Sequence, residues 1–403
     1  MSHPELSVAT GPDDLGEPEA PPGTTLSAFA SPRRALWSTG VALRIEVPAP
    51  WPEHLEVVGE TLAAIAAGPH DNGGHPPVAF AALPYDRAAA ATFVVPRVVH
   101  GLTSDGERWS TVVSGGTPAP PPTPASAAPT PSELVVRSVR PPAEWRDAVA
   151  VARDRIRAGG LTKVVLAREI EVRADSPFDA ATLWNRLRAL HPGALCFAVD
   201  GFVGASPELL VSRVGATVRA QPMAGTTPRT GDPEGDQRRA GELLASEKNR
   251  VEHQITIDAV HEALLPWCSY LDAEPSPSVV AAGPVQHLAT MVEGRLSSPE
   301  PSVLELVAAL HPTPAVGGSP TAAALAVQAE LEGADRGRYA GPVGWVDGDG
   351  NGAFAVGIRS VQLDGATARL WAGVGVVADS DPDDELAETR AKAQALLSAI
   401  VRI

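Results

Sequence analysis

A short turn signal near the C-terminal end restricts the fold of this chain more than any other feature. Asp364-Gly365 separates two strand-like runs, Ala353 to Leu363 and Ala366 to Val377. An Asp-Gly pair between two such runs is typical of a tight β-hairpin, whose strands are antiparallel. The next run, Asp383 to Ile403, opens with three acidic residues, which suit a helix N-terminus. The sequence therefore predicts antiparallel sheet combined with helices, an α+β fold.

Further strands and helices are expected before this hairpin. Runs rich in β-branched residues indicate strands, whereas glycine and proline mark the ends of helices. We predict helices over Pro141 to Arg157, ended by Gly159-Gly160, and over Gln237 to Leu265 as one long element, and strands over Lys163 to Val172, Leu195 to Val203 and Gln286 to Leu296.

Two segments differ in composition from the rest of the chain. Residues 1–25 are acidic and proline-rich, and we expect them to form a flexible leader. Residues 115–131 contain seven prolines, which cannot donate regular backbone hydrogen bonds. This second segment indicates either a boundary between residues 26–114 and 133–403 or a surface loop inserted into one domain.

Net charge and cysteine content narrow the possible functions. The formal net charge is −16, and no basic stripe typical of a nucleic-acid binder is present. No apolar run is long enough to span a bilayer, and the start of the chain lacks the pattern of a secretory signal. Cys196 and Cys268 have no metal-ligand spacing and are expected to be buried thiols. We expect a cytoplasmic protein without nucleic-acid or membrane partners, in which any anionic substrate needs local cations or a metal.

Carboxylates on two predicted helices could hold a hard cation. Glu385, Glu388 and Lys392 are three and four residues apart and share one helix face. Glu247 and Glu252 belong to the long predicted helix. Mg²⁺ takes a few carboxylates and completes its shell with water or substrate oxygens. Alternatively, these glutamates belong to an ordinary solvated helix face, and the charge pattern alone favours this second interpretation.

Two further side chains could act in proton transfer if they are buried. Lys163 opens a predicted strand, and Glu208 precedes three apolar residues. Burial would lower the pKa of a lysine and raise the pKa of a carboxyl group, giving a base and an acid. A solvated lysine at a strand edge is the plain alternative. Glycines at Gly225 and in Gly373-Val374-Gly375 indicate either close approach of a ligand or simple bulges.

Short blocks in a fixed order resemble the chorismate-utilising enzymes, which include anthranilate, aminodeoxychorismate, salicylate and isochorismate synthases. The resemblance extends from about Ser31 to the C-terminus and is most specific from Lys163 onward. The blocks are Ser206-Pro-Glu-Leu-Leu210, Pro222-Met-Ala-Gly-Thr226, Leu244-Ala-Ser-Glu-Lys248 with Glu252-His253, His287-Leu-Ala-Thr290, Leu310-His-Pro-Thr-Pro-Ala315, Gly341-Pro-Val-Gly-Trp345, Ile358-Arg359, Ala372-Gly-Val-Gly375 and the helix with Glu385, Glu388 and Lys392.

The resemblance implies a fold and a set of site residues. The fold would be two antiparallel β-sheets packed face to face with surrounding helices, so residues 26–403 would form a single domain with its catalytic core at 133–403. Matched by motif, Lys163 is the base that activates water, Glu208 is the general acid, and Glu252 and Glu388 bind Mg²⁺, with Glu385 acting through water. The substrate-binding set is Gly225, Thr226, His287, Ala315, Arg359, Gly373, Gly375 and Lys392. His287 receives only a supporting role, because a lone histidine in a strand is more often structural.

Three positions distinguish the branches of this family. Aminodeoxychorismate synthases carry a lysine where this chain has Ala224, and ammonia-using members commonly lack a lysine matching Lys163. Salicylate synthases tend to have threonine where this chain has Ala315. The resemblance therefore implies an isochorismate synthase that acts on chorismate, a monomer without a glutaminase subunit, in menaquinone or siderophore biosynthesis. Salicylate synthase, an amine-transferring synthase and an inactive binding protein are the alternatives.

Overall fold

The computed structural model describes residues 7–12, 26–32, 34–67, 75–114 and 131–401. Every strand pairing among them is antiparallel, and helices cover the sheets, so the predicted α+β class is confirmed. Within these ranges no helix is long and apolar enough to cross a membrane.

One ladder of strands joins the N-terminal and C-terminal parts of the chain. Its central pairs are β2 with β9, β10 with β21, and β22 with β8. In spatial order the ladder contains β5 (Ala91–Leu102), β3 (Ala35–Val47), β2 (Leu26–Ala30), β9 (Leu195–Val199), β10 (Phe202–Ser206), β21 (Ser360–Asp364), β22 (Thr367–Val376), β8 (Lys163–Ala174) and β7 (Leu134–Ser138), with the short β18 (Gly318–Ser319) also paired to β8.

A second ladder begins on the other side of β5. It contains β4 (Val78–Ala82), β19 (Pro342–Asp347), β20 (Gly352–Val356), β11 (Leu209–Val214), β12 (Thr217–Gln221), β17 (Val292–Leu296) and β14 (Cys268–Ala273). β6 (Arg108–Ser114) pairs with the far end of β5 and, in turn, with β1 (Ser7–Pro12). β5 therefore connects both ladders into one continuous sheet.

The two ladders pack against each other through their inner faces. Phe29 and Phe197 of the first ladder share an apolar cluster with Phe80 and Val343 of the second. Phe197 and Phe202 stack with ring centroids 5.5 Å apart. The predicted face-to-face packing is thus confirmed, with the addition that the sheets are joined at one strand.

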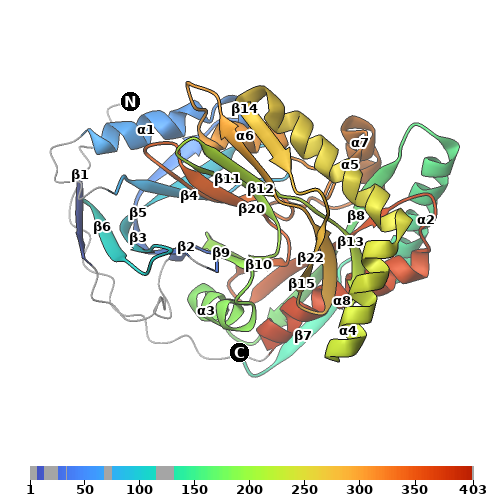
Figure 1. Cartoon of the computed structure of the whole chain (residues 1–403). Helices are drawn as coiled ribbons and strands as arrows, with labels where there is room; N and C mark the ends of the chain where they lie inside the picture. Colours follow the sequence, from blue (N-terminus) through green and yellow to red (C-terminus); the bar gives the residue numbers. More distant parts are fainter. Residues whose placement is uncertain (1–6, 13–25, 33, 68–74, 115–130, 402–403) are drawn as a thin grey trace.

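Helices cover the outer faces of both ladders (Figure 1). Leu187 and Leu396 belong to the helices over the first ladder, and Leu62 and Val260 to those over the second. The first set is α3 (Ala180–Leu190) and α8 (Pro382–Val401); the second is α1 (Glu56–Ala66), α5 (Glu247–Leu264) and α6 (Val303–Leu310); α2 (Pro142–Ala158) and α7 (Thr321–Glu332) pack around β8; and the short 3-10 helices are Trp51–Glu53 and Leu265–Trp267.

A separate three-stranded sheet lies beside this sandwich. Its order is β13 (Met223–Pro228), β16 (Val285–Ala289) and β15 (Ser278–Ala282), and α4 (Pro233–Ala245) and α5 pack against it. The register of β13 shifts between Ala224 and Thr226, so Gly225, at φ +72°, forms a bulge. Bulges often re-aim side chains next to functional sites.

Several predicted elements are confirmed and others are wrong. The helices near residues 141 and 383, the strand from Lys163 and the hairpin at Asp364-Gly365 are present. The predicted helix from Gln237 to Leu265 is two helices, because Ser246 is extended and caps α5. Three predicted strands, over residues 195–203, 286–296 and 353–363, are each two strands divided by short turns or loops, one of which contains Asp200-Gly201 at positive φ.

The two compositionally distinct segments are only partly described. Ser7–Pro12 forms β1 and pairs with β6, so the expectation of a flexible leader is wrong for these residues. The rest of residues 1–25, and residues 115–130 of the proline-rich segment, lie outside the described residues.

Candidate active site

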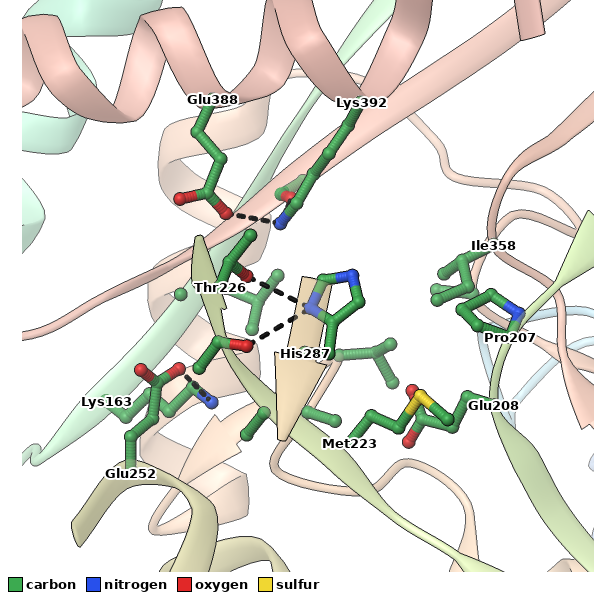
Figure 2. Close-up of a pocket in the computed structure, with 18 of the residues that line it drawn as sticks. Lys163, Pro207, Glu208, Met223, Thr226, Glu252, His287, Ile358, Glu388 and Lys392 are labelled. Atoms are coloured by element: carbon green, nitrogen blue, oxygen red, sulfur yellow. Dashed lines mark hydrogen bonds and ion pairs between the residues drawn. The ribbon is translucent and has the colours of Figure 1, made fainter. Parts of the chain in front are cut away.

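A cavity of about 220 Å³ lies where the small sheet, β8, β22, α5 and α8 meet. Every residue predicted for the site lines this one cavity: Lys163, Glu208, Gly225, Thr226, Glu252, His287, Ala315, Arg359, Gly373, Gly375, Glu385, Glu388 and Lys392. Figure 2 shows several of them converging from different elements of the chain. The structure therefore brings together residues that are more than two hundred positions apart in the sequence.

Lys163 and Glu252 form a buried ion pair at one wall of the cavity (Figure 2). The Lys163 Nζ lies 2.8 Å from Glu252 Oε1, and only 2% of the lysine side chain is exposed. Gly375, across the strand pair, makes this packing possible. A Cβ at Gly375 would lie 2.8 Å from both Glu252 Oε1 and Lys163 Cε, closer than real Cβ contacts. The solvated-edge alternative for Lys163 is therefore wrong.

Glu208 is buried in an apolar part of the same cavity. Burial raises the pKa of its carboxyl group to about 8, although the Met223 backbone N–H and the charges of Lys163 and Arg359 act in the opposite direction. At neutral pH this group is therefore mostly protonated and can donate a proton. Glu208 and the Lys163–Glu252 pair lie on different sides of His287 in Figure 2.

The C-terminal helix α8 presents two carboxylates and one amine to the cavity. Lys392 Nζ lies 2.6 Å from Glu388 Oε1 and donates to the Gly373 carbonyl at 3.0 Å. Burial and the charge of Glu388 raise the pKa of Glu385 to about 7. Burial also acts to raise the pKa of Glu388, but the charge and hydrogen bond of Lys392 hold it below its ordinary value.

His287 occupies the centre of a hydrogen-bonded chain. Its Nε2 lies 3.2 Å from Arg359 Nη2, which can only donate, so Nε2 accepts. Its Nδ1 therefore carries the hydrogen and faces the Gly225 carbonyl at 3.1 Å and Thr226 Oγ1 at 3.2 Å. Burial, with the charges of Arg359 and Lys392, holds the pKa of His287 well below its ordinary value. His287 is thus a neutral group that orients its neighbours.

Arg359 is held in a strained and incompletely paired position. Its backbone has φ +52°, a region that non-glycine residues rarely occupy. Its Nε is buried and has no hydrogen-bond partner among the described residues. Such strain is often found at functional sites. A buried guanidinium with an unused donor is suited to hold the carboxylate of an anionic ligand.

The cavity also fits the donor chemistry of a hard divalent cation. Glu252, Glu385 and Glu388 all line it, and like-charge contact between two of them contributes to the raised pKa of Glu385. In the described ranges no three potential ligands are close enough to form a metal cluster. Mg²⁺ commonly takes only one or two carboxylates and fills its other positions with water and substrate oxygens, so this donor set is sufficient.

Sequence reasoning missed several residues of the cavity wall. Tyr339 is buried, accepts a hydrogen bond from the Gly373 backbone and stacks on Trp371 with centroids 5.9 Å apart. Lys248 and Asn249 enter from the first turn of α5, directly after the capping residue Ser246. Lys248 belongs to a quoted block, so its position was a usable signal, whereas nothing in the pattern marked Tyr339.

The backbone beside Ala315 is fixed by buried polar side chains. Arg336 donates to the Val316 carbonyl at 2.8 Å and to the Val165 carbonyl at 2.9 Å. Gln328 donates to the carbonyls of Val316 and Gly317. The loop that carries Ala315 is thereby connected to β8, the strand that begins with Lys163.

Comparison with known proteins gives consistent matches over most of the chain. The family described as "Chorismate binding enzyme" matches residues 119–401. Isochorismate synthase DhbC of Bacillus subtilis is 36% identical over 385 residues, 92% of each chain. A Mycobacterium tuberculosis protein provisionally named isochorismate synthase MenF is 42% identical over 342 residues, 81% of this chain and 87% of the relative.

A solved structure agrees with these sequence matches. It is a Bacillus anthracis protein provisionally named as a 2,3-dihydroxybenzoate-specific isochorismate synthase, DhbC. Its TM-score is 0.80 at 35% identity, and the match covers 94% of this chain and 96% of that chain.

Proposed function

Since this chain belongs to the chorismate binding enzyme family, we propose that it is an isochorismate synthase that converts chorismate into isochorismate. The observation that carries the proposal is the convergence of all predicted site residues on one buried cavity. The cavity combines a protonated carboxyl group, a buried amine and cations for the carboxylates of the substrate. Its product would enter menaquinone or siderophore biosynthesis, and the enzyme would work as a cytoplasmic monomer without a glutaminase subunit.

The reaction moves a hydroxyl group from C4 to C2 of the ring. Water attacks C2 and loses a proton, the ring double bonds shift, and the C4 hydroxyl leaves as water after it gains a proton. One water is consumed and one is released, so substrate and product are isomers. The site must therefore provide one proton acceptor and one proton donor at different places on the ring.

Glu208 supplies the proton in this proposal. Its pKa of about 8 keeps the Glu208 carboxyl group mostly protonated at neutral pH, so the group can act as a proton donor. Protonation of the departing hydroxyl produces water, a much better leaving group than hydroxide. The resulting carboxylate is stabilised by the charges of Lys163 and Arg359, which act on Glu208.

Lys163 accepts the proton from the attacking water. In the ion pair with Glu252 the lysine is an ammonium group, which has no free electron pair, so Lys163 must give up its own proton before it can accept one from water. Its contact with Glu252 orients the Nζ and restricts it to one wall of the cavity. Because Lys163 and Glu208 come from different walls, they can act on different carbons of one ring.

Arg359 and Lys392 hold the carboxylates of the dianionic substrate. Arg359 offers a buried unused donor, and Lys392 is fixed by Glu388 and the Gly373 carbonyl. The backbone at Gly225, Gly373 and Gly375 lets the ligand approach closely, since a side chain there would fill the space. His287 contacts Arg359, and Thr226 contacts both His287 and Glu388. These contacts hold Arg359 and Glu388 in place.

We further propose that Mg²⁺ is required. Glu252 and Glu388 would hold it, with Glu385 acting through water. When bound, the ion would neutralise charge on a substrate carboxylate and offset the repulsion between the glutamates. The paired lysines Lys163 and Lys392 offset part of that repulsion themselves.

Product identification tests the proposed function directly. Purified protein is incubated with chorismate and Mg²⁺, and the products are separated by chromatography with coupled detection of pyruvate. Isochorismate without stoichiometric pyruvate is expected. Salicylate with pyruvate would replace the proposal with the lyase alternative, and no conversion of chorismate would refute both.

A further inference from the structure

A second cavity adjoins the active-site cavity. Its volume is about 260 Å³, compared with about 220 Å³ for the active site. Pro207 and Arg359 line both cavities, so the two spaces meet at these residues. Its other walls come from the end of α3, the turn between β15 and β16, and α8. A space of this size can hold one molecule as large as the ligand of the active site.

The charges around the second cavity favour an anion. Arg229 and Arg359 line it, and none of the described residues in its wall is Asp or Glu, although Asp236 outside the wall pairs with Arg229. His191 also lines it, but burial and Arg359 lower the pKa of His191, so it adds no full charge. The active-site cavity, in contrast, is lined by Glu208 and three further glutamates. The whole chain carries a formal charge of −16, so a cavity lined only by basic and neutral groups is unusual for this molecule. Such a local field attracts anions from solution.

The remaining wall suits a hydrocarbon ring. Leu187 and Leu396 are buried, and Val280 is half-buried. Basic groups on one side and aliphatic groups on the other match a cyclic carboxylate. Burial of the ring against this wall would add to the attraction of its carboxylates.

Arg359 can serve both cavities because its guanidinium has several donors. Its Nη2 contacts His287 on the active-site side, whereas its buried Nε has no partner among the described residues. Its carbonyl accepts from the Ala205 N–H at 3.1 Å, which fixes the residue in its left-handed conformation. A carboxylate that moves around the edge of this planar group can exchange one N–H donor for the next and so keep contact with the cation.

We propose that the second cavity is an anteroom through which a cyclic dicarboxylate anion reaches and leaves the active site. Arg359 and Arg229 attract the anion, and the aliphatic wall receives its ring. The inference rests on the proposed function, since chorismate and isochorismate are the anions in question. The anteroom lies on the route of the ligand and takes no part in the chemical step.

A plug in the anteroom tests this route. Ala282 lines the cavity at the end of β15, and Ala282→Trp would fill much of the space. Binding of chorismate is followed by stopped-flow tryptophan fluorescence in a Glu208→Gln background, where conversion is slow. If the ligand passes through this space, the association and dissociation rates should fall by the same factor, roughly tenfold or more, within the range of association rates seen among related complexes. The dissociation constant should stay unchanged.

A pair of charge variants provides a second test if the tryptophan disturbs folding. Arg229 is ion-paired with Asp236, with Nε and Oδ2 2.9 Å apart. Arg229→Gln removes the cation of the anteroom, whereas Asp236→Asn breaks the same ion pair and keeps the cation. Arg229→Gln should lower the association rate about fivefold at low ionic strength, and salt should abolish the difference. Asp236→Asn should not lower it.

The contrary outcomes are equally clear. Unchanged rates in Ala282→Trp would refute the anteroom, because the ligand would then use another route. A rise in the dissociation rate alone would also refute it, because that is an ordinary loss of affinity. If Arg229→Gln and Asp236→Asn lowered the association rate equally, the cause would be the broken ion pair between them and not the lost cation. Conversion of chorismate by the wild-type enzyme is measured separately, so either idea can fail without the other.

Discussion

Glu208 shows how burial makes an ordinary carboxyl group useful at neutral pH. Its pKa of about 8 lies above the ordinary 4.5, and burial is the main cause. A kcat/KM that depends on the protonated form should fall as pH rises through about 8. Glu208→Gln keeps the shape but cannot give up a proton, so we expect a loss of about 10² to 10⁴ in rate. Steady-state kinetics across pH on both proteins checks this.

The same shift has a consequence for stability. A carboxyl group with a raised pKa in the folded state contributes stability below pH 4.5 and loses it as pH rises through about 8. Glu208→Gln should therefore become progressively more stable than the wild type between these pH values, as measured by chemical denaturation. Parallel stability curves for the two proteins would contradict the raised pKa.

Gly375 is required by its neighbours and not by its own backbone. An added Cβ would contact Lys163 and Glu252 at 2.8 Å, so Gly375→Ala must displace one of them. We expect kcat to fall about 10², the range for loss of a general base, and the melting temperature to fall as well, because the methyl group overpacks a buried ion pair. Gly241→Ala is the matched control, because nothing lies within 4 Å of its added methyl group. Full activity of Gly375→Ala would show that the position of Lys163 is not critical.

Ala315 is the residue at which product choice is expected to depend on size. Its loop is fixed through Val316 and Gly317, so a larger side chain cannot easily retreat from the cavity. Ala315→Thr should divert part of the product to salicylate and pyruvate, with some loss of total rate from overpacking. Chromatography of both variants decides this. An unchanged product ratio would refute the role of this position alone.

At the scale of elements, the break between α4 and α5 organises the site. Ser246 ends one helix and accepts from the Asn249 N–H at 3.3 Å to begin the next, which carries Glu252. Ser246→Ala should destabilise the fold by about 1 kcal/mol, the usual effect of losing an N-cap. It should also lower activity, because the first turn of α5 would no longer be capped and Glu252 would be held less firmly. Thermal melts and kinetics check both effects.

Ser302→Ala gives a control for that prediction. Ser302 caps α6, which supports the second ladder and contributes no residue to the wall of the active-site cavity. A similar loss of stability with unchanged kcat/KM is expected. Equal loss of activity in both variants would mean that general destabilisation, and not the position of α5, is responsible.

Element type was easier to predict than element boundaries. Charged residues continue from Gln237 to Leu265, so the pattern gave one helix, whereas a single extended serine divides it. Likewise, apolar residues continue on both sides of Asp200-Gly201, and the prediction passed over this pair although it is the same turn signal as Asp364-Gly365. A local conformation of one or two residues leaves almost no trace in hydrophobic periodicity.

At the scale of the whole molecule, the convergence of site residues could be predicted only through motif resemblance. Glu252 and Glu388 are far apart in sequence, and no spacing rule places both beside one cavity. The order of blocks supplied that information. The continuous sheet through β5 and the second cavity at Arg359 arise from tertiary packing, for which the sequence carried no motif.

The proposed dependence on Mg²⁺ would be a property of the assembled molecule, since α5 and α8 would both contribute ligands. Excess chelator should abolish conversion of chorismate, and added Mg²⁺ should restore it. Mg²⁺ should also raise the melting temperature of the wild type but not of Glu388→Gln, because a ligand that binds only the folded state stabilises it. Full activity in chelator would exclude the metal site.

The strand pairings also determine when the protein can fold. β4, near residue 80, pairs with β19, near residue 345, and β8 pairs with β22, which ends at Val376. During translation β3, β4 and β5 can pair with one another, but one edge of β4 and one edge of β8 stay unpaired until strands made hundreds of residues later appear. Folding must be largely post-translational, and the nascent chain is expected to need chaperone protection or slow, dilute expression to avoid aggregation.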